Sequence, residues 1–205
     1  MPTTTTAPPR RSPVITRVIL LIGLVVLVGA LVWQVNEARK SPTGGDPHTD
    51  NPALSAVKTF DFDGGQHTED PVTYAQTPPA GGPHDPVWDD CGVYTQPIRN
   101  ENGVHDLEHG TVWITYRPDL PAADVQSLET QLGTVTSKKT ILSPYPGLPA
   151  PVVVTVWNAQ LDLKGADDSR LPIFLQEYGD GHTAPEAAFA TCEGGADIMA
   201  TPDNP

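Results

Sequence analysis

Basic residues are scarce in this chain. Its 205 residues include 12 lysines and arginines against 25 aspartates and glutamates, which gives a formal net charge of −13 at pH 7. Proteins that bind nucleic acid draw most of their affinity from contacts between basic side chains and phosphates. We therefore expect no nucleic-acid partner, and we interpret the acidity as that of a solvated surface that keeps a domain soluble.

The sequence motifs of several enzyme classes are missing as well. The chain has no G-x-S-x-G nucleophile elbow, no phosphate-binding P-loop and no dinucleotide fingerprint. A nucleotide cofactor is therefore not expected. The 23 prolines and 18 glycines make up one residue in five, which excludes a helical bundle or a coiled coil and indicates a loop-rich domain.

One long apolar run lies near the N-terminus. Residues 18–35 carry no charged side chain and would span about 27 Å as a helix, close to the thickness of the bilayer core. Arg10, Arg11 and Arg17 precede the run without any acidic residue, so we expect a single membrane span with a cytoplasmic N-terminus. A cleaved signal peptide is the alternative, although its apolar core is typically shorter.

The apolar run divides the chain into expected segments. We predict a cytoplasmic tail over 1–17, a transmembrane helix over 18–35, a linker over 36–65, an extracytoplasmic domain over 66–195 and a flexible tail over 196–205. Prolines and glycines at both ends of the linker are typical of a spacer that holds a domain away from the membrane. Localisation at the cell membrane, with the C-terminal domain outside, follows from this arrangement.

The outer domain shows both strand and helix patterns. Segments rich in β-branched and aromatic residues predict buried strands over 111–116, 140–143 and 151–157. Apolar residues at helical spacing, each series ended by glycine, predict helices over 121–132 and 169–178. We therefore expect an α+β fold with a mixed or antiparallel sheet and about two helices. Residues 77–110 should form a long Pro/Gly-rich loop, a kind of segment that often carries function.

Only two cysteines occur, Cys91 and Cys192, and both follow the apolar run. An even number of cysteines in an oxidising compartment indicates a disulfide bond. On the chain-entropy model, a bond across a loop of this length contributes about 3 to 5 kcal/mol to stability. Two free thiolates that act as soft metal ligands are the alternative.

Histidines supply the strongest candidates for chemistry, namely His67, His84, His105 and His109. His105 and His109 are four residues apart, which on a helix places the two imidazoles about 6 Å apart on one face, close enough to share a metal ion. On an extended strand the same spacing is about 13 Å. Metal binding therefore requires a helix or a turn before residue 111, and an all-imidazole set suits Cu(II) or Zn(II).

Asp106 and Glu108 lie between these two histidines and are expected to orient the imidazoles. His105, Glu108 and His109 also match the H-x-x-E-H pattern of inverted zinc peptidases, in which the glutamate is the general base. Such a motif needs several turns of helix, and glycines flank it here, so we expect a protein that is not an enzyme. A Glu108 side chain that holds backbone amides would argue against a hydrolase.

The histidines also have a purely structural interpretation. Each imidazole can donate a hydrogen bond to a backbone carbonyl and so hold a proline-rich loop in place. The protein would then be an envelope scaffold or an accessory subunit, and its functional surface would contact a protein partner. Dispersed imidazoles would favour this alternative.

Four sequence blocks resemble the domain-of-unknown-function 3105 family: TPPAGGPH at 77–84, CGVY at 91–94, VHDLEHGTVWITYRP at 104–118 and LSPYPGLP at 142–149. The resemblance covers residues 67–195 and implies a single-span protein like the membrane-anchored actinobacterial envelope proteins that typify the family. It places the four histidines and both cysteines on positions of the family, but not His48, His182 or Met199. It also makes copper the first ion to test, because the genes of relatives lie near genes for copper-associated envelope proteins.

Overall fold

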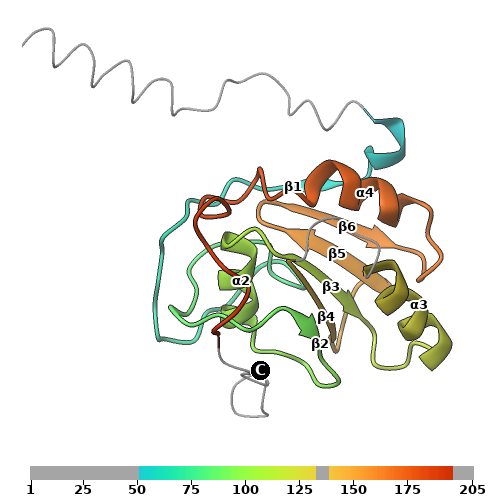
Figure 1. Ribbon diagram of the computed structural model, residues 1–205, viewed down its shortest axis with the longest axis horizontal. Coiled ribbons are helices and arrows are strands. Elements are labelled where there is room, and N and C mark those ends of the chain that lie inside the picture. The colour runs from blue at the N-terminus through green and yellow to red at the C-terminus, as the bar shows by residue number, and fades with distance from the viewer. Residues whose placement is uncertain (1–50, 133–138, 196–205) are drawn as a thin grey trace, which may run out of the picture. The chain divides into compact units, whose positions relative to one another are not determined.

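The computed structural model describes residues 51–132 and 139–195 (Figure 1). The predicted tail over 1–17, the predicted membrane helix over 18–35 and the predicted tail over 196–205 lie outside these residues. In the described ranges, no helix is both long and apolar enough to cross a membrane.

A mixed six-stranded sheet forms the centre of the fold (Figure 1). The strands are β1 (Lys58–Thr59), β2 (Gly92–Val93), β3 (Val112–Tyr116), β4 (Thr140–Pro144), β5 (Val152–Val156) and β6 (Ala159–Leu163), in the order β1-β6-β5-β3-β4-β2. β3 pairs in parallel with β4 and antiparallel with β5. β2 extends the parallel side, whereas β6 and β1 extend the antiparallel side. The predicted α+β class is thus confirmed, and β3, β4 and β5 are the three predicted strands.

The helices are α2 (Asn100–Glu108), α3 (Ala122–Leu132) and α4 (Arg170–Tyr178), with a short 3-10 turn η2 at Pro52–Leu54. α3 and α4 match the two predicted helices. α2 was not predicted, because its segment was expected to belong to the long loop over 77–110. Almost all of its side chains are buried, polar ones included, so its sequence lacks the apolar periodicity that marks a helix with one solvated face.

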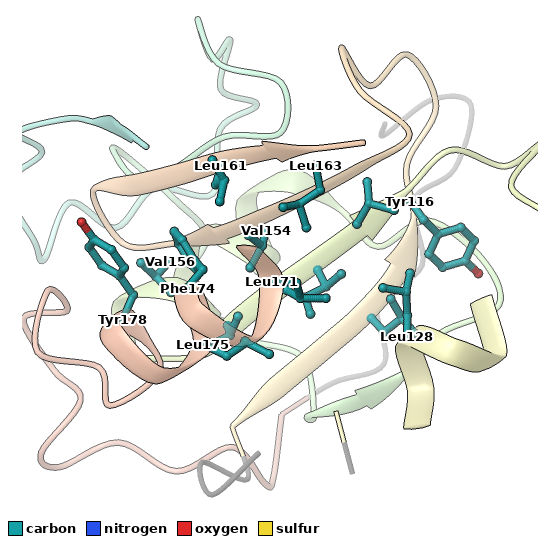
Figure 2. Packing of buried hydrophobic residues seen from close by; sticks show 14 of the residues in the cluster. Tyr116, Leu128, Val154, Val156, Leu161, Leu163, Leu171, Phe174, Leu175 and Tyr178 are labelled. Carbon is teal, nitrogen blue, oxygen red and sulfur yellow. The ribbon is translucent and has the colours of Figure 1, made fainter. Parts of the chain in front are cut away.

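One face of the sheet packs against α3 and α4. Val112, Ile114 and Tyr116 of β3 point toward this face because alternate residues of a strand share a side. Figure 2 shows the α4 residues beside Val154 and Val156 of β5, and Leu128 of α3 near Tyr116. The α4 side chains in this layer are Leu171, Phe174, Leu175 and Tyr178.

The opposite face packs against α2. Trp113 of β3 and Ile141 of β4 join Val104 and Leu107 of α2 in a second apolar cluster. Gly103 lets the helix lie close to the sheet, because a Cβ at this position would come within 2.9 Å of the Trp113 ring. The sheet therefore fixes the position of α2.

The domain begins earlier than its expected boundary at residue 66. Leu54 of η2 is only 2% exposed and belongs to the core beside α4, and β1 pairs with β6. The expected linker over 36–65 therefore overlaps the fold. The composition of the segment did not predict this early start, because a single buried leucine and a two-residue edge strand leave too short a pattern in the sequence.

Candidate metal centre

The C-terminal half of α2 supplies two of the candidate ligands. His105 lies in its last turn, and His109 is the residue that caps its end. The helical conformation that metal binding requires is therefore present, and the two Nε2 atoms lie 2.9 Å apart. The His109 amide also bonds to the His105 carbonyl, which continues the helical pattern into the cap.

The other two histidines come from separate loop segments that meet as an isolated parallel bridge. His67 pairs with His84 in this bridge, where the Thr68 amide donates to the His84 carbonyl at 2.7 Å and the His84 amide donates to the Gln66 carbonyl at 3.0 Å. Gly81 lies just before His84 with a φ of 144°, and a Cβ there would come within 2.6 Å of the Phe62 ring. The glycine thus allows the loop to turn tightly toward α2.

All four predicted histidines meet in one cluster. The ring centroids of His67, His84 and His105 are 4.8 to 5.0 Å apart, and the His109 ring lies 4.4 Å from that of His105. One ring nitrogen from each of His67, His84 and His105 lies within 4.8 Å of the other two. The imidazoles are therefore gathered rather than dispersed.

Backbone carbonyls fix the orientation of two of these rings. His105 Nδ1 donates to the Asp85 carbonyl at 2.6 Å, and His84 Nδ1 donates to the Gly82 carbonyl at 2.8 Å. In a neutral imidazole, a protonated Nδ1 leaves the lone pair on Nε2. Both rings therefore turn Nε2 toward the cluster, in the way that outer hydrogen bonds orient metal-ligating histidines.

Glu108 lies against the cluster with a fully buried side chain. Its Oε2 is 3.0 Å from His84 Nε2 and 3.4 Å from His67 Nε2, while its Oε1 accepts a hydrogen bond from the Gly65 amide at 2.5 Å. Burial by itself would raise the pKa of Glu108, but these hydrogen bonds outweigh burial and lower the pKa to about 2. The group is a buried carboxylate at neutral pH.

Asp106 does not orient an imidazole as expected. Its Oδ2 accepts a hydrogen bond from the Asp89 amide at 3.2 Å. Burial, together with the nearby Asp89 carboxyl, raises the pKa of Asp106 well above its usual value. The Asp106 side chain directly follows that of His105 on the helix, and adjacent residues of a helix do not face each other.

Burial also keeps the α2 imidazoles neutral. It lowers the pKa of His105, and burial together with the neighbouring His105 lowers the pKa of His109 to about 4. Neutral imidazole is the form that ligates metal ions. The Trp88 ring packs over both, with centroid distances of 5.6 Å to His105 and 5.1 Å to His109.

His84 faces an oxygen acceptor on each side of its ring. Nδ1 meets the Gly82 carbonyl and Nε2 meets the Glu108 carboxylate, and neither oxygen has a proton to donate when the carboxylate is ionised. A neutral imidazole carries only one N–H and would leave a lone pair opposite a negative oxygen. A second proton on the ring, or a cation beside Nε2, removes this repulsion.

The predicted disulfide is confirmed. Cys91 and Cys192 are bonded, with 5.3 Å between their Cα atoms, and the Cys91 amide donates to the Cys192 carbonyl at 2.9 Å. The bond therefore joins the C-terminal segment of the domain to the residue that precedes β2. These two sulfurs are not available as thiolate ligands.

Some candidate residues lie elsewhere, and one neighbour was not foreseen. His182 pairs with Asp180 and stacks on Tyr178, whereas His48 and Met199 lie outside the described residues. Glu186 was not singled out, yet its Oε2 is 3.9 Å from His109 Nε2. No local pattern marks it, because the contact depends on how the C-terminal segment returns to α2.

Comparison with known proteins identifies the family of this chain. No curated protein and no solved structure matches the chain. A family model described as a protein of unknown function (DUF3105) matches residues 66–194, well over half of the sequence and the whole of the histidine cluster. The chain therefore belongs to this family of proteins of unknown function.

Proposed function

We propose that this domain binds a transition-metal ion, copper or zinc, through its histidine cluster and acts as a binding or delivery protein rather than as an enzyme. One observation carries the proposal: ring nitrogens of His67, His84 and His105 converge within 4.8 Å of one another. His109 borders this set through its contact with His105. Imidazole nitrogen is a ligand that both ions favour.

The spacing suits a small ion with short bonds. A zinc–imidazole bond of 2.0 to 2.1 Å places neighbouring ligand nitrogens of a tetrahedral site about 3.4 Å apart. Each ring needs to approach the centre by less than about 1 Å to reach that arrangement. Calcium and magnesium are disfavoured, since both prefer oxygen ligands.

The charge around the cluster supports a cation. Glu108 brings a buried negative charge to the same point as the His67 and His84 nitrogens. An ion bound to His84 Nε2 would lie beside the Glu108 carboxylate, which would balance part of its charge. Histidine binds metal ions through a deprotonated nitrogen, so the affinity for the ion should fall as the pH falls.

We also propose that the domain is tethered to the cell membrane by the helix expected over 18–35, with its C-terminal part outside. The charge distribution around that run supports this orientation. The Cys91–Cys192 bond supports an oxidising compartment. A copper carrier at this location would exchange its ion with an envelope protein partner.

A structural role for the histidines is the second candidate. The hydrogen bonds of His84 to Gly82 and of His105 to Asp85 join loop to helix in the way expected of loop supports. On this alternative the domain is an envelope scaffold or accessory subunit. A zinc hydrolase is less well supported, because Glu108 holds the Gly65 amide and so is not placed as a general base.

Metal titration of the purified full-length protein separates these candidates. We expect one Cu²⁺ or Zn²⁺ ion per chain by calorimetry and elemental analysis, and loss of binding in His84→Gln/His105→Gln. His182→Gln is the matched control, because this ring lies outside the cluster. A folded, oxidised wild-type protein that binds neither ion would exclude metal binding, and a double variant that only melts earlier would support the scaffold.

A further inference from the structure

The edge of the histidine cluster near His109 includes a carboxylate that the inner set does not use. His109 Nε2 lies 2.9 Å from His105 Nε2 and 3.9 Å from Glu186 Oε2. One nitrogen thus faces the buried cluster and a more exposed carboxylate at the same time. The Glu186 side chain is 47% exposed, whereas that of His109 is 7% exposed.

The segment that carries Glu186 is anchored at several points. The Glu186 amide donates to the Glu108 carbonyl at 3.2 Å. Lys139 Nζ donates to the His109 carbonyl at 3.0 Å and to the Ala187 and Ala190 carbonyls at 3.0 and 2.9 Å. Because Lys139 joins the end of α2 to this segment, the Glu186 carboxylate is held beside the His109 ring.

We infer that His109 and Glu186 form an outer subsite, where a hydrated divalent cation binds first before it moves to the inner set of His67, His84 and His105. The inference rests on the proposed metal-binding function and adds the route by which the ion enters and leaves. A carboxylate oxygen and a neutral imidazole are ligands that a hydrated Cu²⁺ or Zn²⁺ ion accepts in exchange for water.

The passage between the two positions is a series of ligand exchanges. The ion gives up water for Glu186 Oε2 and for His109 Nε2, whose proton passes to solvent while Nδ1 of the same ring takes one up, so that the imidazole stays neutral. The ion then exchanges Glu186 for His105 Nε2 while His109 stays bound. His105 Nε2 is close enough to His109 Nε2 for one ion to contact both rings. No electron is transferred, and the displaced waters return to solvent.

A second edge of the cluster also meets solvent. The His67 side chain is 39% exposed, so an ion could also enter the cluster past this residue. The Glu108 carboxylate beside His67 is fully buried, however. At the His109 edge, by contrast, a carboxylate that is 47% exposed lies 3.9 Å from a ligand nitrogen, and a solvated negative charge raises the local concentration of cations.

Rapid mixing of the full-length protein with Cu²⁺ tests the subsite. Binding is followed by quenching of tryptophan fluorescence, since Trp88 packs on His105 and His109. Release is followed by transfer to an excess of chelator. Glu186→Gln removes the charge and keeps the shape, and Glu193→Gln is the matched control on the same segment, with an exposed side chain.

We expect capture and release to slow together by about threefold or more in Glu186→Gln, with little change in Kd, because the subsite lies on the path and not at its end. Glu193→Gln should match the wild type. Unchanged rates in Glu186→Gln would overturn the inference and indicate entry at His67. Faster release alone would overturn it too, since Glu186 would then be a ligand of the final site.

Two further outcomes complete the test. Slower capture with unchanged release would overturn the subsite, because Glu186 would attract ions without binding them. Loss of stoichiometric binding with a lower Tm would also overturn it and make Glu186 a structural residue. A wild-type protein that binds no Cu²⁺ and no Zn²⁺ would remove the proposed function itself, whereas every other outcome concerns the Glu186→Gln variant and leaves the proposed function of the wild-type protein standing.

Discussion

Replacement of Glu108 by glutamine tests how the buried carboxylate stabilises the domain. In the metal-free protein, Glu108 accepts hydrogen bonds from the Gly65 amide and from the His84 ring, with no exposure to solvent. Glutamine keeps the size of the side chain and one carbonyl oxygen, but it removes the charge. One charge-assisted hydrogen bond is therefore lost while the packing is preserved.

The expected magnitude follows from that single bond. A buried hydrogen bond to a charged group contributes about 1.5 to 3 kcal/mol to the free energy of unfolding. For a chain of this size, a loss of that order lowers Tm by roughly 5 to 10 °C. Glu108→Gln should also lower the affinity for Cu²⁺ or Zn²⁺ by about 10- to 100-fold, as for other residues that support metal ligands.

The loss of stability in Glu108→Gln should depend on pH. The hydrogen bonds of Glu108 lower its pKa from 4.5 in the unfolded chain to about 2 in the fold. A carboxyl whose pKa falls on folding stabilises the fold fully above about pH 4.5, and this contribution is lost as the pH falls toward 2. The difference between wild type and Glu108→Gln should therefore be largest near pH 7 and shrink below pH 4.5.

Urea unfolding of the metal-free proteins at pH 7 and at pH 3 measures this difference. Glu193→Gln serves as the control for a change of net charge at an exposed position. A destabilisation that is equal at both pH values would refute the assigned role of the charge. Equal stability of wild type and Glu108→Gln at pH 7 would refute the hydrogen-bond argument as a whole.

Three other substitutions test the fold around the site. Gly103→Ala should lower stability by about 1 to 3 kcal/mol, because its Cβ would overlap the Trp113 ring, so a raised Tm would contradict the packing of α2. Phe174→Ala should cost about 3 to 5 kcal/mol in urea unfolding, since the ring is fully buried, and a cost below 1 would oppose the assigned core. Asp168→Asn should cost about 1.5 to 3 kcal/mol at pH 7 through loss of the Arg170 ion pair. That pair lowers the Asp168 pKa, so the deficit should diminish as pH falls below 3.8, and a constant deficit would count against it.

Elements with a run of β-branched and aromatic residues or a clear helical period could be predicted from the sequence. The segments expected over 111–116 and 151–157 are β3 and β5, and the helix expected over 121–132 is α3. The residue pattern of each of these segments can be recognised within the segment itself, without knowledge of the rest of the fold. β6 was not predicted, because only a two-residue turn separates it from β5 and its own five residues are few. Asn158 in this turn has a positive φ of 64°, which closes the β5–β6 hairpin.

Helix α2 was missed for the opposite reason. Loops cover the side of α2 that would otherwise be solvated, so Glu101, Asn102 and Glu108 are buried as thoroughly as Leu107. A helix enclosed in this way needs partners for its polar groups rather than an apolar stripe. The Arg99 guanidinium lies 3.1 Å from the Glu101 carboxylate, and the side-chain amide of Asn102 donates through Nδ2 to the Val87 carbonyl. Such partners depend on chain segments that no local pattern identifies.

In the candidate site, too, the local contacts could be predicted from the sequence and the long-range contacts could not. The spacing of His105 and His109 predicted that the two imidazoles lie together if their segment is helical, because a helix fixes that distance. The approach of His67 and His84 depends on a bridge between two loop segments, and that of Glu186 on a segment held by Lys139 and a disulfide. Ligands from such distant segments meet only in the folded chain. Ion binding should therefore depend on the tertiary structure as a whole, so substitutions that loosen α2 or the C-terminal segment should weaken binding even where they contact no imidazole.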